Sequence, residues 1–452
     1  MRKRLVFCFD GTWNRLDAAC PTNVVLTAES VLPLAPDGTA QLIFYDEGVG
    51  TDKDETLRGG MFGQGLVKNL ADAYRFLIFN YSPGDQIYIF GFSRGAYTAR
   101  SFAGLINTCG VILRKYAAAI DVAIGHYKRR DASPEYLEEM LIYRKDHSPY
   151  VVASDEEEEW RYRISRQRSL PRLEVSYLGV WDTVGALGIP KRYQWFSWIN
   201  EKHKFHDASL SKFVKSARHA VATDERRLDF QPTLWDNIDE LNSGCSKKSD
   251  EPDAPYQQVW FPGVHSAVGG GGERRGLSDG ALEWILDGAR AAGLVLDPDK
   301  FSRVFEHKPN YREFIENSEE PGMLYTFMNK VAGADRSPGP KALHEVSVSA
   351  KRRWLEDPKN LKDGVQYRPG ALKDVAALLD VLDPANYGLG AQDDELQKFD
   401  VYEVRRGDNL STIAKAMYGE GGDYKRIFRA NLHQIDDPHR IYPGQLLRIP
   451  RP

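Results

Sequence analysis

Residues 91–95, Gly-Phe-Ser-Arg-Gly, are the clearest candidate in this sequence for covalent chemistry. A short apolar run at 87–90 precedes them, and small or apolar residues follow at helical spacing over 96–106. Glycine on both sides of Ser93 permits a tight strand-to-helix turn that projects the hydroxyl from the carboxyl end of the strand. We therefore predict that Ser93 is a nucleophile. The alternative is an ordinary Gly-Ser turn.

A serine hydroxyl needs a base to accept its proton and an acid to orient that base. Asp182 directly follows a predicted strand over 173–180, and His265 follows another over 257–261 in a glycine-flanked loop. The order Ser, Asp, His along the chain is that of an α/β-hydrolase. These placements predict a catalytic triad, while the alternative for Asp182 is to cap the turn that follows its strand.

An ester hydrolase also needs two backbone amides that bind the oxyanion of its tetrahedral intermediate. One is the amide that follows the nucleophile, which here belongs to Arg94. A predicted strand over 5–9 ends in Asp-Gly-Thr, and we expect the amide of Gly11 or Thr12 to provide the second donor.

The other histidines offer weaker signals. His219 lies in a stretch over 217–227 that looks helical, and a structural role is expected for it. His203 and His206 have a loose metal-ligand spacing, but no further ligands accompany them. We therefore expect neither a metal nor a cofactor.

Composition narrows the class of protein. The chain has 452 residues, 42% of them hydrophobic, and a formal net charge of −4, which argues against a nucleic-acid partner. Four widely spaced cysteines indicate neither a zinc site nor a disulfide framework. The apolar run after the basic start is stopped by Asp10, so we expect no signal peptide and synthesis in the cytoplasm.

The predicted elements describe a mostly parallel α/β sheet with helical additions. Further elements are a strand over 41–45, a glycine-rich loop over 47–65 and a helix over 66–77. A helical insertion is expected over about 115–170, and its charge run at 155–163 is interpreted as a solvated helix face. Residues 298–397 offer no recognisable chemistry.

The end of the chain differs from the rest. Residues 400–452 predict a separate βααβ module, with a strand over 401–405, Asp408 as the cap of the first helix, and a last strand over 446–449. We expect a hydrolase domain over 1–385, a linker over 386–399 and this module over 400–452.

Six segments together resemble the α/β-hydrolase family typified by type VI secretion phospholipase effectors. They are VFCFDGTWN (6–14), GFSRGAYTAR (91–100), LGVWDTVGALG (178–188), ARHAVATDERRLDFQP (217–232), WFPGVHSAVGGG (260–271) and LSDGALEW (277–284). The resemblance covers roughly 1–380. It implies a triad of Ser93, Asp182 and His265 that hydrolyses acyl esters of phospholipids at a membrane surface.

A second resemblance lies in YEVRRGDNLSTIAKAMYG (402–419), IFRANLHQI (427–435) and IYPGQLLRIP (441–450), which are similar to a LysM domain. The resemblance implies binding of a glycan such as peptidoglycan or chitin. The groove would be formed by Gly407, Asp408, Asn409 and Leu410 on one loop and Ile435 on the other. The alternative is a structural adaptor in a secretion assembly.

The two resemblances imply an exported antibacterial effector, delivered by a type VI-like system, with a secretion spike or an immunity protein as partner. Two other functions stay open. One is a carboxylesterase that acts on small or wall-linked esters, and the other is a non-catalytic binding protein built on a hydrolase scaffold.

Overall fold

The computed structural model describes most of the chain. The described residues are 2–11, 18–48, 61–129, 133–166, 169–185, 209–297, 309–316, 334–387, 389, 399–431, 435 and 437–451.

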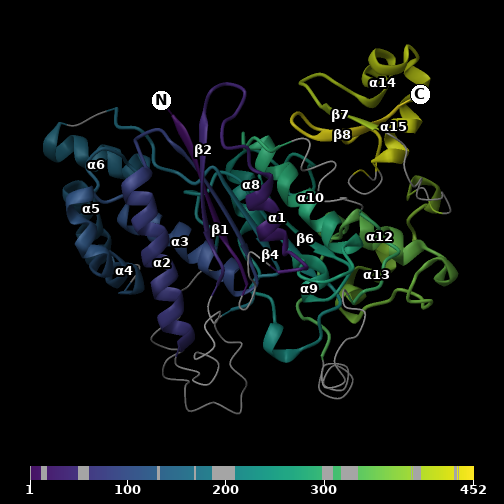
Figure 1. Cartoon of the computed structure of the whole chain (residues 1–452), viewed down its shortest axis with the longest axis horizontal. Helices are drawn as coiled ribbons and strands as arrows, with labels where there is room; N and C mark the ends of the chain where they lie inside the picture. The colour runs from purple at the N-terminus through teal and green to yellow at the C-terminus, as the bar shows by residue number, and fades with distance from the viewer. Residues whose placement is uncertain are drawn as a thin grey trace.

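A six-stranded sheet forms the centre of the molecule (Figure 1). Its strands follow the spatial order β2-β1-β3-β4-β5-β6, and all neighbours are parallel. The strands are β1 (Lys3–Phe9), β2 (Ala40–Asp46), β3 (Gln86–Phe92), β4 (Tyr177–Trp181), β5 (Ala217–Ala222) and β6 (Tyr256–Phe261). The predicted α/β-hydrolase-like class is confirmed.

The pairing register brings the carboxyl ends of the strands to one edge of the sheet. Phe9 lies opposite both Asp46 and Gly91, and Phe92 lies opposite Trp181. Because the loops after β1, β3 and β4 leave from this common edge, residues that are far apart in the sequence meet there.

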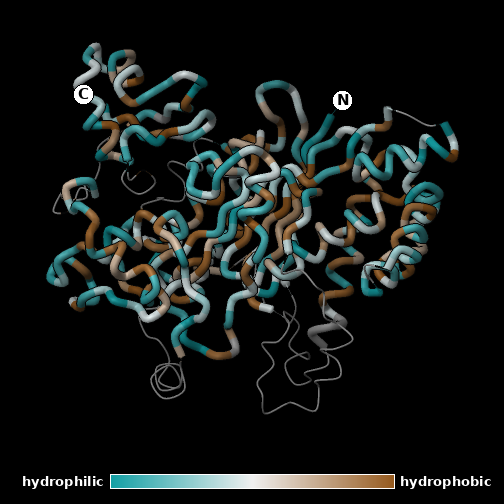
Figure 2. The backbone as a smooth tube through the Cα atoms, turned by 180° about the vertical axis from the view of Figure 1, so that it is seen from behind, coloured by the Kyte–Doolittle hydropathy of each residue, from teal (hydrophilic) through white to brown (hydrophobic). Residues whose placement is uncertain are grey.

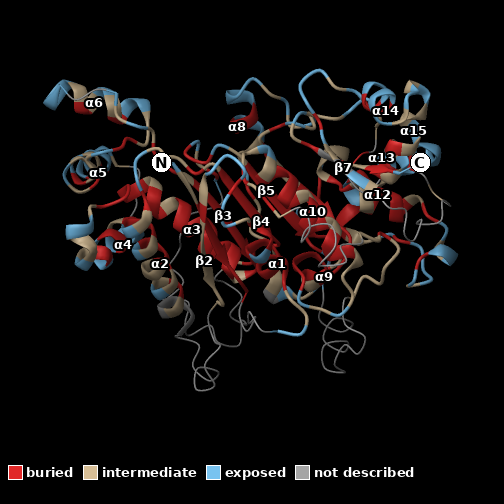
Figure 3. Cartoon of the chain, turned by 45° about the horizontal axis from the view of Figure 1, so that its top comes forward, coloured by how far each residue is buried: buried red, intermediate tan, exposed pale blue. Residues whose placement is uncertain are grey.

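Helices cover both faces of the sheet, so its central strands are apolar on both sides. Alternate residues of β1 show this: Phe7 packs toward α2 (Met61–Asn80) and α3 (Arg94–Cys109), whereas Val6 packs toward α1 (Asn23–Ser30) and α10 (Gly276–Ala291). Figure 2 shows the resulting concentration of hydrophobic residues along the strands, and Figure 3 shows that the same region is buried.

Strand β5 corrects the helical interpretation of 217–227. Alanine and arginine favour helices, and the stretch has no alternation of polar and apolar residues. All six residues of β5 are buried between β4 and β6, and this position in the sheet overrides the local preference.

The segment after α3 is helical, as predicted, and lies at one end of the sheet (Figure 1). It contains the 3-10 helix η1 (Arg114–Ala119) and helices α4 (Ile120–Arg129), α5 (Pro134–His147) and α6 (Asp155–Ser165). The solvated face expected at 155–163 is wrong for Glu157 and Arg161, which are 1% and 0% exposed and ion-paired at 2.7 Å. Arg161 also donates to the carbonyls of Ser148 and Pro149, so it holds the chain between α5 and α6.

Further short elements complete this part of the chain. They are η3 (Leu228–Phe230), α8 (Ile238–Gly244), α9 (His265–Gly269), η5 (Leu343–Glu345), α12 (Val348–Leu355), η6 (Pro358–Asn360), η7 (Gly370–Val375), α13 (Ala376–Asp380) and η8 (Pro384–Tyr387). Residues 343–382 have a hydrophobic cluster of their own, and Val346 pairs with Trp260 at the edge of the sheet.

The last part of the chain has the expected βααβ order and lies at the end of the sheet opposite α4–α6 (Figure 1). It comprises β7 (Phe399–Glu403), α14 (Leu410–Tyr418), η9 (Gly421–Asp423), α15 (Tyr424–Ala430) and β8 (Leu446–Pro450). The two strands pair antiparallel around a separate hydrophobic cluster. Most of the linker expected at 386–399 lies outside the described residues, so the domain limits stay a prediction.

Candidate active site

Ser93 occupies a sharp turn between β3 and α3. Its φ of 59° and ψ of −123° are unusual for a residue with a side chain. A Cβ atom at Gly91 would lie 2.5 Å from the carbonyl oxygen of Gly95, and one at Gly95 would lie 2.2 Å from that of Phe9. Both glycines are therefore required by close backbone approach, as in a nucleophile elbow.

His265 follows β6 and lies beside Ser93 at the carboxyl edge of the sheet. It is the first residue of α9, not part of a flexible loop as its glycine neighbours indicated. Its Nε2 atom lies 2.8 Å from Ser93 Oγ. The imidazole ring packs against Phe92 and Phe230, with ring centroids 4.7 and 4.8 Å away, and this packing restricts its orientation.

Asp182 completes the hydrogen-bonded chain. Its Oδ2 atom lies 2.5 Å from His265 Nδ1, and the amide of Ala222 donates to its Oδ1 at 2.9 Å. Ser93, His265 and Asp182 are 6%, 5% and 0% exposed, so the hydrogen bonds lie in a largely dry environment. The structure thus brings together all three residues of the predicted triad.

Arg336 is a contact that the sequence did not reveal. Its guanidinium group binds both carboxylate oxygens of Asp182, with Nη2 2.8 Å from Oδ2 and Nη1 in contact with Oδ1. It also donates to the carbonyls of Ala222 and Phe230, at 2.8 and 2.6 Å. Arg336 lies within 298–397, a proline-punctuated stretch in which the sequence showed no recognisable chemistry, so no motif pointed to this contact.

Burial and neighbouring charges set the protonation states of Asp182 and His265. Burial alone would raise the pKa of Asp182, but Arg336 and His265 outweigh it and hold that pKa well below its usual range. Burial lowers the pKa of His265, Arg336 lowers it further, and Asp182 and Glu225 oppose this. His265 is therefore neutral and able to accept a proton around neutral pH.

Two further carboxylates, Glu225 and Asp224, lie near the backbone of His265 and of the loop before it. Glu225 accepts from the backbone amide of His265 at 3.3 Å and is paired with Arg227 at 2.7 Å. Asp224 accepts from the amide of Gly263 and from the hydroxyl of Tyr367. These carboxylates hold the loop that precedes His265 through its backbone amides.

Two of the three amides expected to bind the oxyanion, those of Arg94 and Gly11, lie in the described part of the chain. The amide of Arg94 begins α3, and the first amides of a helix have no acceptor within it. The close approach of Gly95 to Phe9 and Asp10 places the end of β1 beside the elbow. The amide of Gly11 donates to Asp10 Oδ1 at 2.6 Å, so it must leave this contact to bind an oxyanion. Thr12 lies outside the described residues.

The remaining histidine predictions differ in outcome. His219 is buried in β5, accepts from the amide of Thr183 and contacts Gln258 Oε1. Burial lowers its pKa to about 3, so it is a neutral structural residue. His203 and His206 lie outside the described residues. Within the described part of the chain, no group of three or more His, Cys, Asp or Glu side chains could hold a metal ion.

The residues expected to bind glycan lie in the C-terminal βααβ unit and have structural contacts. Leu410 and Ile435 are 2% exposed and belong to its hydrophobic cluster. Asp408 accepts from Tyr402 Oη and the amide of Arg405. Asn409, and not Asp408, caps α14 through a reciprocal bond with Thr412. Gly407 has a φ of 93°, and it and Asn409 are the exposed residues among the five.

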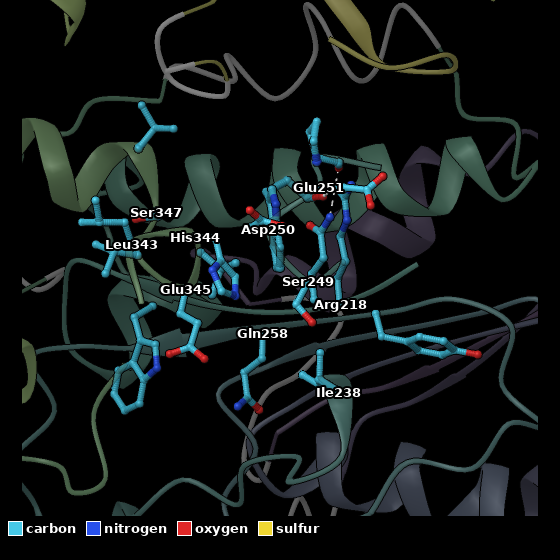
Figure 4. Close-up of a pocket in the computed structure, with 18 of the residues that line it drawn as sticks. Arg218, Ile238, Ser249, Asp250, Glu251, Gln258, Leu343, His344, Glu345 and Ser347 are labelled. Atoms are coloured by element: carbon cyan, nitrogen blue, oxygen red, sulfur yellow. Dashed lines mark hydrogen bonds between the residues drawn. The ribbon is translucent and has the colours of Figure 1, made fainter. Parts of the chain in front are cut away.

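A pocket of about 760 Å³ lies elsewhere, on the outer side of β6 (Figure 4). Arg218, Gln258, His344 and Glu345 line it together with Ile435 of the C-terminal unit. None of the triad residues lines this pocket. It is therefore a separate feature of the surface.

The parallel sheet, the strained serine between two glycines and the Ser-His-Asp contacts are those of an α/β-hydrolase-type protein. The sequence model of the type VI secretion system Tle1-like phospholipase effector catalytic domain matches residues 3–288, and the chain belongs to this family. Residues 402–450 match the LysM domain.

Several proteins share parts of this sequence. An uncharacterized protein of Saccharomyces cerevisiae is 27% identical over 246 residues, which are 51% of this chain and 32% of that protein. The potassium binding protein Kbp of Escherichia coli O6:H1 is 51% identical over 49 residues, which are 11% of this chain and 33% of that protein. The chain thus spans about a third of the length of these curated relatives.

Two solved structures were also found. The Tle1 effector bound to the VgrG spike of the type VI secretion system is 19% identical, with a TM-score of 0.32, over 60% of this chain and 51% of that one. An uncharacterized protein from Pseudomonas aeruginosa is 15% identical, with a TM-score of 0.34, over 98% of this chain and 75% of that one.

Within the described residues, no helix combines the length and apolar character needed to cross a membrane.

Proposed function

We propose that this protein is a serine hydrolase that cleaves acyl esters of phospholipids. The observation that supports this most strongly is the hydrogen-bonded series Ser93–His265–Asp182, with heavy-atom distances of 2.8 and 2.5 Å. Family membership supports phospholipids as the substrate class. The strained turn at Ser93 supports a nucleophile over a plain Gly-Ser turn.

In this mechanism, His265 Nε2 accepts the proton of Ser93 as Oγ attacks the ester carbonyl carbon. Asp182 holds the Nδ1 proton, which fixes the tautomer, and stabilises the imidazolium that forms. The imidazolium then protonates the departing alcohol, leaving an acyl group on Ser93. Water attacks this acyl-enzyme with His265 as base, releasing the fatty acid and restoring the serine.

The negative charge that develops on the carbonyl oxygen needs preorganised donors. We assign one to the Arg94 amide and the second to the amide of Gly11 or Thr12. The Gly11 amide would have to leave Asp10 Oδ1 in order to serve as this donor. Loss of one such donor would lower the rate by about 100- to 1,000-fold.

Substrate class is tested with purified full-length protein and a panel of defined phospholipids and short-chain esters, with products identified by mass spectrometry. Turnover of phospholipids by the wild type, and its loss in Ser93→Ala, supports the proposal. Turnover of short esters alone would favour the carboxylesterase. No turnover of any ester would favour a non-catalytic binding protein.

We further propose that the LysM domain binds a glycan of the peptidoglycan or chitin type through the backbone of its 407–410 loop. Cosedimentation of the full chain with insoluble peptidoglycan and with chitin tests this. Binding of neither polymer would favour the adaptor role.

Family membership also supports delivery through a type VI secretion system, with the secretion spike as a partner. Copurification of the full chain with the spike protein tests this partner.

A further inference from the structure

The buried side chain of Arg336 binds Asp182 and two backbone carbonyls near it. It is fully buried, and its two terminal nitrogens reach both oxygens of Asp182 as well as the carbonyls of Ala222 and Phe230. A planar guanidinium that spans two carboxylate oxygens fixes both the position and the rotation of the carboxylate.

The chain around Arg336 is itself held in place. The amide of Ala334 donates to the carbonyl of Arg226 at 3.0 Å, and Asp335 pairs with Arg226 at 3.2 Å. A Cβ atom at Gly339 would lie 1.9 Å from the carbonyl oxygen of Ala371, so the chain also packs tightly after Arg336. The guanidinium is therefore preorganised rather than free to follow Asp182.

We propose that Arg336 is a positioning residue for the triad, which orients Asp182 by binding both of its carboxylate oxygens and offsets part of its negative charge. This inference rests on the proposed function and deepens it. Arg336 lies beyond residues 3–288, the part that matches the family, so the catalytic arrangement depends on a segment outside the matched region.

The charges that face His265 have opposing effects on its protonation. Asp182 from the end of β4 and Glu225 from the end of β5 favour its protonation, whereas Arg336 disfavours it. Ser93 and the rings of Phe92 and Phe230 are uncharged neighbours. Glu225 is already paired with Arg227, whereas Arg336 is the cation bound to Asp182. Because Arg336→Gln removes that cation, we expect the pKa of His265 to rise.

The direct test is an NMR titration of the His265 imidazole in the full chain, in wild type and in Arg336→Gln. His265→Asn identifies the signal. We expect the His265 pKa to rise by about one unit or more in Arg336→Gln. An unchanged His265 pKa in a folded Arg336→Gln protein would overturn the proposal.

Arg353→Gln is the matched control. Arg353 is also almost completely buried, binds the carboxylate of Asp363 and donates to the carbonyl of Tyr311 at 2.7 Å, but makes no triad contact. It should lower stability as Arg336→Gln does and leave the His265 titration unchanged. An equal His265 shift in both variants would mean that Arg336 acts only through general stability, against the proposal.

A second readout is the rate at which an organophosphate labels Ser93 as a function of pH. In Arg336→Gln, half-maximal labelling should move to higher pH by the same amount as the NMR titration. Arg336→Lys, which also serves if the Gln variant does not fold, keeps a charge but cannot span two oxygens. It should keep the wild-type midpoint and lose about tenfold or more in plateau rate.

A wild-type plateau in Arg336→Lys would contradict the positioning role. If Ser93 is not labelled in wild type at any pH, the proposed serine hydrolase fails, while the NMR comparison still decides the role of Arg336.

Discussion

Ser93 is held in a conformation that residues with side chains rarely adopt, and its partners are buried and ordered around it. Its hydroxyl is hydrogen-bonded to His265, which packs against Phe92 and Phe230. The histidine is hydrogen-bonded in turn to Asp182, whose carboxylate binds the guanidinium of Arg336. Positional freedom has been removed from each of the three groups before any substrate binds. Such preorganisation is what acyl transfer requires of its catalytic groups.

The protonation of His265 gives a prediction at the same scale. Burial, aided by Arg336, lowers its pKa below the usual 6.5, and a base with a lowered pKa stays active until the pH falls below that value. We therefore expect the acid limb of kcat/KM for ester hydrolysis to lie below pH 6.5. A pH–rate profile of the wild type measures it, and an acid limb above pH 7 would contradict the assigned charges.

The meeting of Ser93, Asp182 and His265 was predictable because each follows a strand and has a residue type suited to the role expected of it. Arg336 was not, since one arginine in a stretch without periodicity looks like any surface cation. The signal was in three dimensions only: Asp182 and Arg336 are 154 residues apart in the chain. No local pattern records a contact of this kind.

At the scale of elements, the turn from β3 to α3 depends on backbone packing against β1. A methyl group at Gly95 would overlap the carbonyl oxygens of Phe9 and Asp10, which cannot move without disturbing the sheet. We expect Gly95→Ala to lower the free energy of unfolding by at least about 1–3 kcal/mol and to abolish labelling of Ser93. Denaturant unfolding and organophosphate labelling measure the two effects.

Gly125→Ala is the control for that substitution. Gly125 lies within α4, and a Cβ atom there would meet nothing within 4 Å. It should raise the free energy of unfolding by about 0.5–1 kcal/mol and leave labelling unchanged. If Gly95→Ala behaved like Gly125→Ala, the close approach of β1 to the elbow would not be essential.

The cap of α14 yields a further prediction. Asn409 Oδ1 accepts from the amide of Thr412 at 2.9 Å, and the Asn409 amide donates to Thr412 Oγ1 at 2.9 Å in return. Removing the Asn409 side chain in Asn409→Ala should cost the LysM domain about 1 kcal/mol. Ser411→Ala, at an exposed position on the same helix, is the control. Thermal unfolding followed in the LysM domain compares them, and equal effects would contradict the capping role.

Strands β1, β2, β3 and β6 could be predicted because apolar or β-branched runs end in turn residues. Strand β5 could not, since its sequence favours a helix and only its two neighbours make it a strand. The buried Glu157–Arg161 pair was missed for the opposite reason. Its i,i+4 spacing is typical of solvated helices, and the carbonyls that Arg161 binds are contributed by the preceding loop.

At the scale of the whole molecule, the LysM domain is joined to the hydrolase part by specific polar contacts. Arg448 pairs with Glu283 of α10 at 3.1 Å, and Arg218 of β5 donates to Tyr442 Oη at 2.9 Å. Arg440 also binds the carbonyl of Asp250. The LysM domain is therefore docked against the hydrolase part rather than only tethered to it.

Asp287 lies near Arg218 and Arg448 of this interface, and we expect it to make stability depend on pH. Burial raises its pKa to about 7, which Arg290 opposes and Glu283 favours, with Arg218 and Arg448 nearby. Since the pKa is higher than in the unfolded chain, stability should fall as the pH rises from about 4 to above 7. In Asp287→Asn this loss should be smaller. Unfolding midpoints at pH 5 and pH 8 measure it, and identical pH dependence in both proteins would contradict the assignment.

The central claim, that Ser93 is an activated nucleophile, is tested most directly by intact-protein mass spectrometry after treatment with an organophosphate. Ser93→Ala is compared with Ser101→Ala, whose wild-type Oγ is buried in α3 and has no hydrogen-bond partner among the described residues. We predict one adduct, mapped to Ser93, in wild type and Ser101→Ala, and none in Ser93→Ala. An unmodified wild type, or an adduct that persists in Ser93→Ala, would contradict the account.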